Sequence, residues 1–529
     1  MKTFQREVCN LYLWAMLLIL PILVHNKYED ITGFKEVFFL GIFTLFLVCS
    51  MIAVIGKYAS YRSMGADLPK VRDGLRSMSV LDWSILAFGI VAILSSLTTR
   101  YGLRHALLAD GALFVGGAMF LCLMIAFFLF SRGAEAARMG YIYGFYVSSF
   151  FVVLLGLLNH LRIDPLGMHK DNVMDTFVVM ASTIGNFDYY HGYVSLVLMF
   201  FAAYRADMKR GWQTVMVDVF LVMSYLDVWL SRASGTYVGV AYGLVILVFM
   251  GLLSFSRFKN LFWQGILAGI AGILAEGLCH YKADIWYAID YEISGRLLRR
   301  HLWLPVGIIC LVIWLILLKK EKDGNTQKIE EILVKFRRPY VILAAIMLIG
   351  ATAFVVLTPQ GGILSGRAFI WDDIKKMYPL GSVREKIIGI GSGCIDFARK
   401  RLHMITDPNV DYLYSMGYET AHNELYEYGL ELGILGVVSY ICAEVSCFTS
   451  YFRAMLGSQS DAGVKASASD REDMATGVPY ERELGCCAVL FAAYLGQGMT
   501  NGPNPVPTIV AFTFLALFRR YQIPDVDEF

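Results

Sequence analysis

Residues 36–56, EVFFLGIFTLFLVCSMIAVIG, decide the fold of this chain. The stretch carries one charged residue, at its first position, and is otherwise almost entirely apolar. A helix of about 20 residues spans about 30 Å, which is the thickness of the hydrocarbon core of a bilayer. A stretch of this length and composition is therefore predicted to form a transmembrane helix.

Similar apolar runs recur along the whole chain. Hydrophobic residues make up 57% of its 529 residues, whereas soluble domains average about 45–50%. The predicted spans lie near 10–25, 36–56, 80–97, 111–131, 139–159, 191–204, 213–231, 235–254, 261–280, 302–318, 340–357, 429–452, 484–499 and 506–518. Because the runs at 191–204 and 506–518 are short, the sequence predicts an all-α polytopic transmembrane bundle of about 12–14 spans.

The predicted organisation has three consecutive parts. Residues 1–357 form the main transmembrane bundle with eleven spans, and residues 429–529 add the C-terminal spans, with a polar linker at 453–483. Between these parts, residues 358–428 are too polar to cross a membrane and form one long loop that we expect to contain short helices. The first run lacks a small-residue cleavage site, so it is predicted to be a span and not a signal peptide.

Basic residues predict the orientation. With the N-terminus placed in the cytoplasm, the inner segments hold 27 Lys and Arg residues and the short outer loops hold 11. Cytoplasmic loops carry an excess of basic residues. Both termini are therefore predicted to be cytoplasmic and the long loop external. The nine histidines then fall on or near the outer face: His25, His105, His160, His169, His191, His280, His301, His403 and His422.

Arg232 is the first candidate functional residue. It stands between two apolar runs with almost no loop around it. An arginine so close to hydrocarbon is costly unless it has a partner or a water-filled cavity. It is either an interfacial arginine that extends toward the headgroups or an anion site for a phosphate or a carboxylate.

The long loop begins and ends with further candidates. Arg367 and Trp371 are spaced i, i+4 and share one face if the segment is helical. The stretch Ile388 to Gly393 is rich in glycine, but no Lys-Ser/Thr follows it, so a nucleotide P-loop is not supported. Near the end of the loop, the stretch Ala421 to Tyr428 presents a histidine next to an asparagine, an aromatic residue and a carboxylate.

The order of these elements resembles the O-antigen ligase and polymerase family of polytopic membrane proteins. The stretch Ser182 to Asp188 is similar to a Gly-Thr-Phe-Gly-Asn-Pro-Asn element of that family, with Asn186 matched. Ser231-Arg232 matches its Ser-Arg element, and Ser365 to Trp371 with Gly389 to Gly391 match its loop opening. His422-Asn423 and Gly433 to Gly436 match its loop end.

The resemblance implies a glycosyltransferase that needs no metal and no cofactor. It would act on polyprenyl-pyrophosphate-linked glycan at the outer face of the cytoplasmic membrane, polymerising repeat units or ligating the glycan to an acceptor in surface polysaccharide biosynthesis. Arg232 and Arg367 would bind the pyrophosphate, and His422 would accept the proton of the attacking hydroxyl. The predicted substrate-binding residues are Asn186, Trp371, Asn423, Tyr426 and Glu427.

Two alternatives stay open at this point. A polytopic transporter or a lipid-linked glycan flippase also suits many spans, although transporter sites usually lie at broken helices near the midplane. A non-catalytic assembly protein would leave Arg232, Arg367 and His422 unexplained. The shared-site interpretation requires these three residues to meet. A net charge of +2 gives no indication of nucleic acid as a partner.

Overall fold

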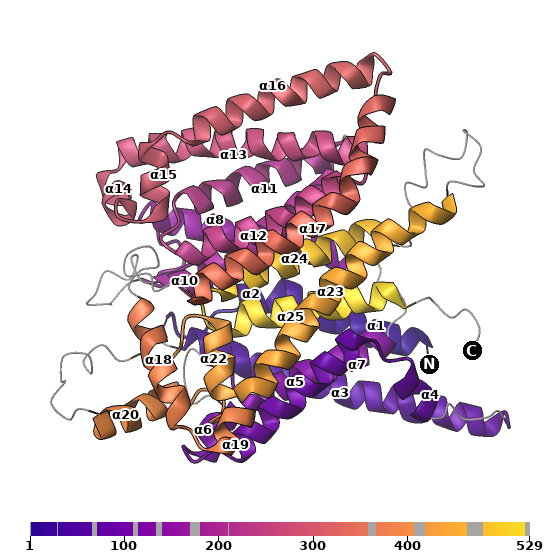
Figure 1. Cartoon of the computed structure of the whole chain (residues 1–529), viewed down its shortest axis with the longest axis vertical. Helices are drawn as coiled ribbons and strands as arrows, with labels where there is room; N and C mark the ends of the chain where they lie inside the picture. The colour runs from indigo at the N-terminus through magenta and orange to yellow at the C-terminus, as the bar shows by residue number, and fades with distance from the viewer. Residues whose placement is uncertain are drawn as a thin grey trace. The chain divides into compact units, whose positions relative to one another are not determined.

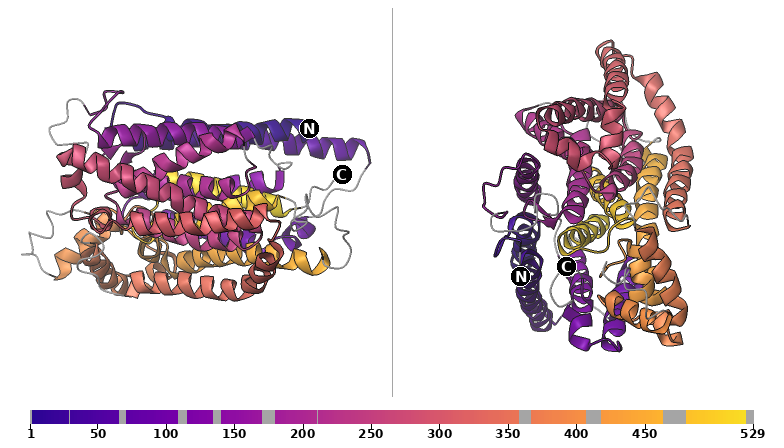
Figure 2. Two further views of the ribbon diagram at one scale, coloured as in Figure 1. Left: turned by 90° about the horizontal axis from the view of Figure 1, so that it is seen from above. Right: turned by 90° about the vertical axis from the view of Figure 1, so that its left-hand side faces the viewer.

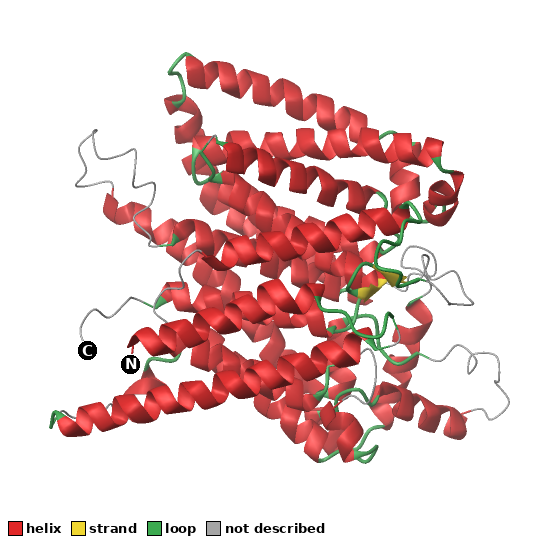
Figure 3. Ribbon diagram, turned by 180° about the vertical axis from the view of Figure 1, so that it is seen from behind, coloured by secondary structure: helices red, strands yellow, loops and turns green. Residues whose placement is uncertain are grey.

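The structure is a computed structural model in which most of the described residues are helical (Figure 3). It describes residues 2–28, 30–65, 71–108, 115–133, 140–169, 180–209, 211–357, 367–406, 418–462 and 480–523. In this part of the chain, β1 (Met180–Ala181) and β2 (Gly185–Asn186) form one short antiparallel hairpin. The predicted all-α fold is therefore confirmed.

Each of the fourteen predicted spans overlaps a helix. In chain order these helices are α1 (Lys2–Trp14) with η1 (Ala15–Ile19) and α2 (Leu20–Ile22), α3 (Ile31–Ser63), α5 (Val80–Leu97), α7 (Gly117–Gly133), α8 (Gly140–His160), α10 (Phe187–Ala206), α11 (Trp212–Trp229), α12 (Ser234–Gly251), α13 (Phe255–Tyr281), α16 (Trp303–Lys322), α17 (Gln327–Leu357), α23 (Gly433–Ala462), α24 (Glu481–Gly498) and α25 (Pro505–Gln522). Shorter helices connect them: α4 (Val71–Arg76), α6 (Leu103–Leu108), α14 (Ala283–Ile289), α15 (Ile293–Arg299), α18 (Ala368–Leu380), α19 (Val383–Ile388), α20 (Ile395–Thr406) and α22 (Glu424–Glu431).

Eight of the described helices are long and apolar enough to cross a membrane, so the chain is a multi-pass membrane protein. These are α3, α5, α8, α12, α13, α16, α17 and the Gly433–Gly457 part of α23. In α16 and α17 only 6% and 11% of the most apolar 18-residue stretch is buried. Both helices lie at the edge of their part of the protein (Figure 2). Their uncovered apolar side chains are suited to contact with lipid.

Other predicted spans carry a weaker apolar signal for a physical reason. The side chains of α10, α24 and α25 are almost all buried within the protein. A helix that is covered by other helices has no lipid-facing side, so it tolerates polar residues such as His191 and Gln497. The exact number of spans within the range 12–14 stays a prediction.

The chain divides into two compact units. Unit 1 comprises Met1–Ser148, Pro359–Phe448 and Thr500–Phe529, and unit 2 comprises Ser149–Thr358 and Thr449–Met499. Each unit thus joins segments that are far apart in the sequence. In unit 1, α7 packs against both α5 and α25, while α19 and α22 pack together beside α5 (Figure 1).

Glycines allow close helix packing at the centre of unit 2. A Cβ atom on Gly239 of α12 would lie 2.6 Å from the Ser195 Oγ atom of α10. A Cβ atom on Gly496 of α24 would lie 2.5 Å from the carbonyl oxygen of Val238. Small residues let helix backbones approach closely in membranes, where the hydrophobic effect does not drive helices together. Larger side chains at these two positions would push α10, α12 and α24 apart.

The polar linker predicted at 453–483 is partly helical. Helix α23 continues to Ala462, and α24 begins at Glu481. Residues 463–479 of the predicted linker lie outside the described residues.

Candidate functional site

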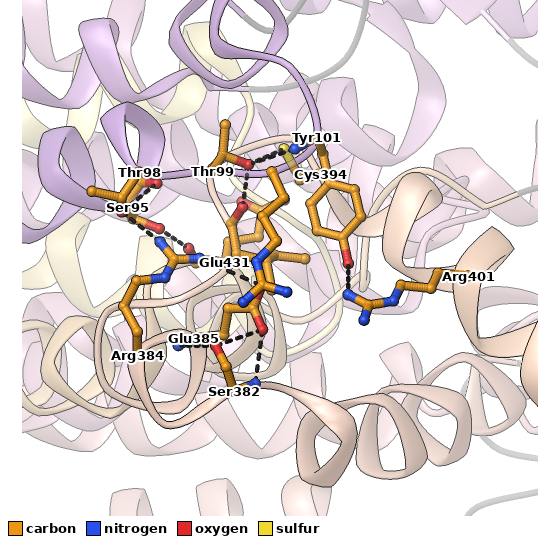
Figure 4. Close-up of polar contacts among 12 residues, drawn as sticks. Ser95, Thr98, Thr99, Tyr101, Ser382, Arg384, Glu385, Cys394, Arg401 and Glu431 are labelled. Carbon is orange, nitrogen blue, oxygen red and sulfur yellow. Dashed lines mark hydrogen bonds and ion pairs between the residues drawn. The ribbon is translucent and has the colours of Figure 1, made fainter.

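In the part of the long loop that the structure describes, the chain forms the short helices α18, α19, α20 and α22, here called the loop subdomain. It docks on the C-terminal end of α5, all within unit 1. The Ser95 hydroxyl donates a hydrogen bond to the Glu431 carbonyl oxygen at 2.5 Å, and the Thr99 hydroxyl donates one to the Ile390 carbonyl oxygen at 2.5 Å (Figure 4). Glu431 is the last residue of α22, where the helix itself supplies no N–H to the carbonyl oxygen.

The glycine-rich stretch of the loop is a structural contact. Gly389 and Gly391 have φ values of 86° and 110°, which residues with a Cβ atom rarely adopt. A Cβ atom on Gly389 would lie 1.9 Å from the Glu431 carbonyl oxygen. The next amides, of Ile390 and Gly391, donate to the Leu430 and Glu431 carbonyl oxygens at 3.1 Å each. This segment therefore binds the end of α22 backbone to backbone.

A buried carboxylate organises the turn before α19. Glu385 forms a capping box with Ser382 and lies 3.5 Å from Arg100 and 3.4 Å from Arg384. Burial acts to raise the pKa of Glu385, but the hydrogen bonds from Ser382 and the two guanidinium groups outweigh burial and lower it. The carboxylate is therefore charged at neutral pH and fixes α19 beside α5.

Two residues predicted from the sequence, Arg367 and Trp371, lie at the start of α18. Arg367 is the N-cap residue and is 6% exposed, and its carbonyl oxygen accepts the backbone N–H of Trp371 at 3.2 Å. The buried indole of Trp371 donates its Nε1–H to the Ala421 carbonyl oxygen at 2.9 Å. The indole also stacks on Tyr426, with 5.5 Å between ring centroids and 22° between ring planes. These two contacts join the start of α18 to the segment at Ala421–Tyr426, about fifty residues further along the chain.

His422 directly follows the residue that Trp371 binds. Its backbone has a φ of +47°, and its N–H donates to the Thr420 hydroxyl at 3.2 Å. A non-glycine residue in this region costs about 1–3 kcal/mol and persists only where its surroundings hold it. The backbone of the half-buried His422 is therefore held in a fixed conformation, directly after the residue that the Trp371 indole binds.

Asn423 and Glu427, which were predicted to bind substrate, are buried and hold the backbone around His422. Asn423 caps α22, with its side-chain oxygen accepting the amides of Leu425 and Tyr426 at 2.9 and 3.2 Å. Glu427 accepts the Ala421 amide at 2.9 Å. Burial raises the pKa of Glu427 to about 8, since the Ala421 hydrogen bond only partly offsets the loss of solvation. Both side chains position His422 in the structure.

The loop subdomain also contains a pocket that the sequence did not reveal. It measures about 120 Å³, and its polar lining consists of Tyr101, Tyr378, Glu385 and Arg401. The Arg401 guanidinium donates to the Tyr101 hydroxyl at 3.5 Å (Figure 4). Aromatic faces beside hydroxyl, guanidinium and carboxylate groups suit a small polar ligand such as a sugar.

Unit 2 holds the other two predicted residues, Asn186 and Arg232. Asn186 caps α10, with its side-chain oxygen accepting the Asp188 amide at 2.8 Å. The guanidinium carbon of Arg232 lies 5.3 Å from the ring centroid of Phe187, the residue after Asn186. A cation–π contact of this kind contributes about 0.5–2 kcal/mol. The Ser182–Asp188 element and the Ser231-Arg232 element are therefore neighbours.

The predicted site residues thus form two groups. Arg367, Trp371, His422, Asn423, Tyr426 and Glu427 belong to unit 1, and Asn186 and Arg232 belong to unit 2. The shared site of Arg232, Arg367 and His422 stays a prediction. Ser365 of the loop-opening motif lies outside the described residues.

One cluster in unit 2 was missed by sequence reasoning. His160, His191 and Asp227 come from the ends of three successive predicted spans, and their nitrogen and oxygen atoms lie within 4.8 Å of one another. The predicted topology already placed both histidines near one face. Their spacing in the sequence matches no metal motif, so only the packing of α8, α10 and α11 reveals the cluster.

Comparison with known proteins does not identify the chain. No model of a known protein family matches it, and no curated protein matches it either. The fold establishes the class, a multi-pass α-helical membrane protein. The function is inferred from the site.

Proposed function

We propose that this protein transfers a glycan from a polyprenyl-pyrophosphate carrier to an acceptor hydroxyl, at the outer face of the cytoplasmic membrane. The transfer either polymerises repeat units or ligates the glycan to an acceptor. One observation carries this proposal: the loop subdomain joins the start of α18 to the segment before α22, through the bond from Trp371 to Ala421. Arg367, Trp371, His422 and Tyr426 are thereby gathered in one region.

The chemistry of the transfer explains the residue types. The acceptor oxygen forms a bond to the anomeric carbon, and the bond from that carbon to the pyrophosphate oxygen breaks. Polyprenyl pyrophosphate leaves with the electron pair, and the proton of the acceptor hydroxyl passes to His422. Histidine suits this step because its ordinary pKa lies near neutrality.

Guanidinium groups suit the leaving group. Negative charge grows on the pyrophosphate as the bond breaks, and arginine keeps its charge and binds phosphate oxygens in a bidentate manner. Arg367, which belongs to the same unit as His422, is assigned this role. The half-buried ring of Tyr426, which the buried Trp371 indole supports from behind, would stack on a sugar ring of the substrate.

Single substitutions in the native host test the proposal. We expect Arg367→Ala and His422→Ala to shorten or abolish surface glycan, since general acid–base catalysis alone contributes about 10²–10⁴-fold. Matched controls are Arg300→Ala and His280→Ala, because both side chains are exposed in unit 2. Protein levels in the membrane are measured in parallel.

Two outcomes would count against the proposal. Normal glycan length and amount in well-expressed Arg367→Ala and His422→Ala variants would remove both residues from the mechanism. Unpolymerised lipid-linked glycan that accumulates on the inner leaflet would instead indicate a flippase, because transfer takes place only after the carrier has crossed the membrane.

A further inference from the structure

Three side chains with metal-ligand chemistry converge in unit 2. They are His160 at the end of α8, His191 in the first turns of α10 and Asp227 near the end of α11. The His160 Nε2 atom lies 3.1 Å from the Asp227 Oδ1 atom, and the His191 Nε2 atom lies 3.7 Å from the same oxygen. Asp227 is fully buried and His191 is 1% exposed.

Two further hydrogen bonds fix the orientation of these groups. The Nδ1 atom of His191 lies 2.9 Å from the Phe187 carbonyl oxygen. A carbonyl can only accept, so Nδ1 carries the hydrogen, and in the neutral ring Nε2 carries the lone pair. The Tyr190 hydroxyl donates to the Asp227 Oδ2 atom and holds the carboxylate from the other side.

This arrangement leaves two electron-rich atoms facing each other. His191 Nε2 is buried and has no hydrogen-bond partner among the residues that the structure describes. At 3.7 Å the distance to Asp227 Oδ1 is too long for a hydrogen bond. A buried lone pair beside a buried carboxylate is unfavourable unless a proton or a metal cation lies between them.

We propose that His160, His191 and Asp227 bind a divalent transition-metal ion, such as Zn²⁺, through His160 Nε2, His191 Nε2 and Asp227 Oδ1. Zinc lies about 2.0–2.2 Å from histidine nitrogen and carboxylate oxygen, so two ligand atoms of a tetrahedral site are separated by about 3.3 Å. The two separations that involve Asp227 Oδ1, 3.1 and 3.7 Å, lie on either side of that value, and all three ligand atoms lie within 4.8 Å of one another.

The surroundings of the cluster match the usual support of metal sites. Metal-binding histidines commonly donate their other ring N–H to a backbone carbonyl, and metal-binding carboxylates are themselves hydrogen-bonded. The bond from His191 to Phe187 and the bond from Tyr190 to Asp227 are of these two kinds. Neutral imidazole and carboxylate together suit zinc, iron or nickel.

A small pocket gives access to the cluster. His160 lines it together with Asn159, Arg162, Arg232 and Asp284. Three protein ligands leave a coordination position for water or for an oxygen of a bound anion. A cation beside two guanidinium groups would strengthen phosphate binding at Arg232. The metal site stands on its own geometry, and only the identity of that anion as a lipid pyrophosphate rests on the proposed function.

Metal content of the purified full-length protein tests the proposal. The protein is stripped with a chelator in detergent, incubated with Zn²⁺ and desalted, and its zinc is measured by mass spectrometry. We expect about one zinc ion per wild-type chain. We expect loss of that ion in His160→Gln and zinc affinity about 10–100-fold lower in Tyr190→Phe, which removes only the supporting hydrogen bond.

A matched control separates this site from adventitious binding. His25 and Asp30 form a similar pair at 3.2 Å but are about half exposed, so His25→Ala is expected to keep the zinc. Replacing zinc with Co²⁺ should give visible absorption bands in wild type that His160→Gln lacks. Thermal unfolding shows whether each variant is folded.

Two results would overturn the metal site: wild type that binds no more zinc than folded His160→Gln, or equal zinc in all variants. Glycan transfer is measured on the same samples. An Arg367→Ala protein that binds zinc fully but does not transfer glycan would show that the metal site and the glycan transfer can fail or succeed separately.

Discussion

Trp371→Phe removes one hydrogen-bond donor from the loop subdomain and keeps an aromatic ring against Tyr426. The lost bond, from the indole Nε1–H to the Ala421 carbonyl oxygen, is 2.9 Å long, and the indole is 2% exposed. An unpaired buried carbonyl costs about 1–3 kcal/mol. If residues 418–428 open locally, the equilibrium constant for that opening should be larger in Trp371→Phe than in wild type by a factor of about 5–150.

Hydrogen exchange measures this effect directly. We expect amide exchange in residues 418–428 to accelerate by that factor in Trp371→Phe, while exchange in α5 and α7 stays at the wild-type rate. Trp83→Phe is the control, because that indole is 47% exposed. Unchanged exchange of residues 418–428 in Trp371→Phe would refute the inference that the indole holds the segment before His422.

Two further predictions concern the same segment. Because the pKa of Glu427 is raised to about 8 in the folded state, the native state binds more protons than the unfolded state between about pH 4.5 and 8. Stability from the neutral carboxyl is therefore complete below about pH 4.5 and is lost as pH rises through about 8. The thermal midpoint of wild type should fall from about pH 5 to pH 8 more than that of Glu427→Gln, because the folded and unfolded states differ in bound protons only in this window; parallel curves would contradict this assignment. Gly389→Ala should destabilise the loop subdomain by more than about 2 kcal/mol, since the added Cβ atom would lie 1.9 Å from the Glu431 carbonyl oxygen. Gly350→Ala has open space inside α17 and should keep stability or raise it by up to about 1 kcal/mol, because alanine favours a helix over glycine, and equal effects of the two changes on protease resistance would be inconsistent with this contact.

The helical architecture could be predicted from the sequence because lipid imposes a simple constraint. Every backbone polar group in the hydrocarbon region needs an internal partner, so apolar runs of sufficient length must be helices. The signal was strongest in α3 and α17, whose apolar side chains are largely exposed. It was weakest in α10 and α25, where burial by other helices removes the need for an apolar surface.

The arrangement around the candidate site was harder to predict. The pairing of Trp371 with Ala421 and Tyr426 depends on how the loop helices fold, and no local pattern encodes a contact across about fifty residues. Asn423 and Glu427 carry functional groups that substrate binding and capping both use, so the sequence alone did not distinguish these roles. In the structure, both side chains are buried within the loop subdomain.

The cluster of His160, His191 and Asp227 shows a similar limit. Metal motifs are recognised by short spacings within one element, whereas these ligands come from three helices. The sequence alone was sufficient to predict that the histidines lie on or near one face of the bundle. Bringing their Nε2 atoms to one carboxylate oxygen required the packing of α8, α10 and α11.

The most direct test of the proposed function is transfer by the purified protein. Wild-type protein in lipid nanodiscs is incubated with a polyprenyl-pyrophosphate-linked glycan and its acceptor, and released polyprenyl pyrophosphate and glycan product are measured by mass spectrometry. We expect wild type to release the carrier and form the product in equal amounts, and Arg367→Ala and His422→Ala to be slower by about 100-fold or more. Release and product formation at the wild-type rate by the doubly substituted Arg367→Ala, His422→Ala protein would contradict the proposed mechanism.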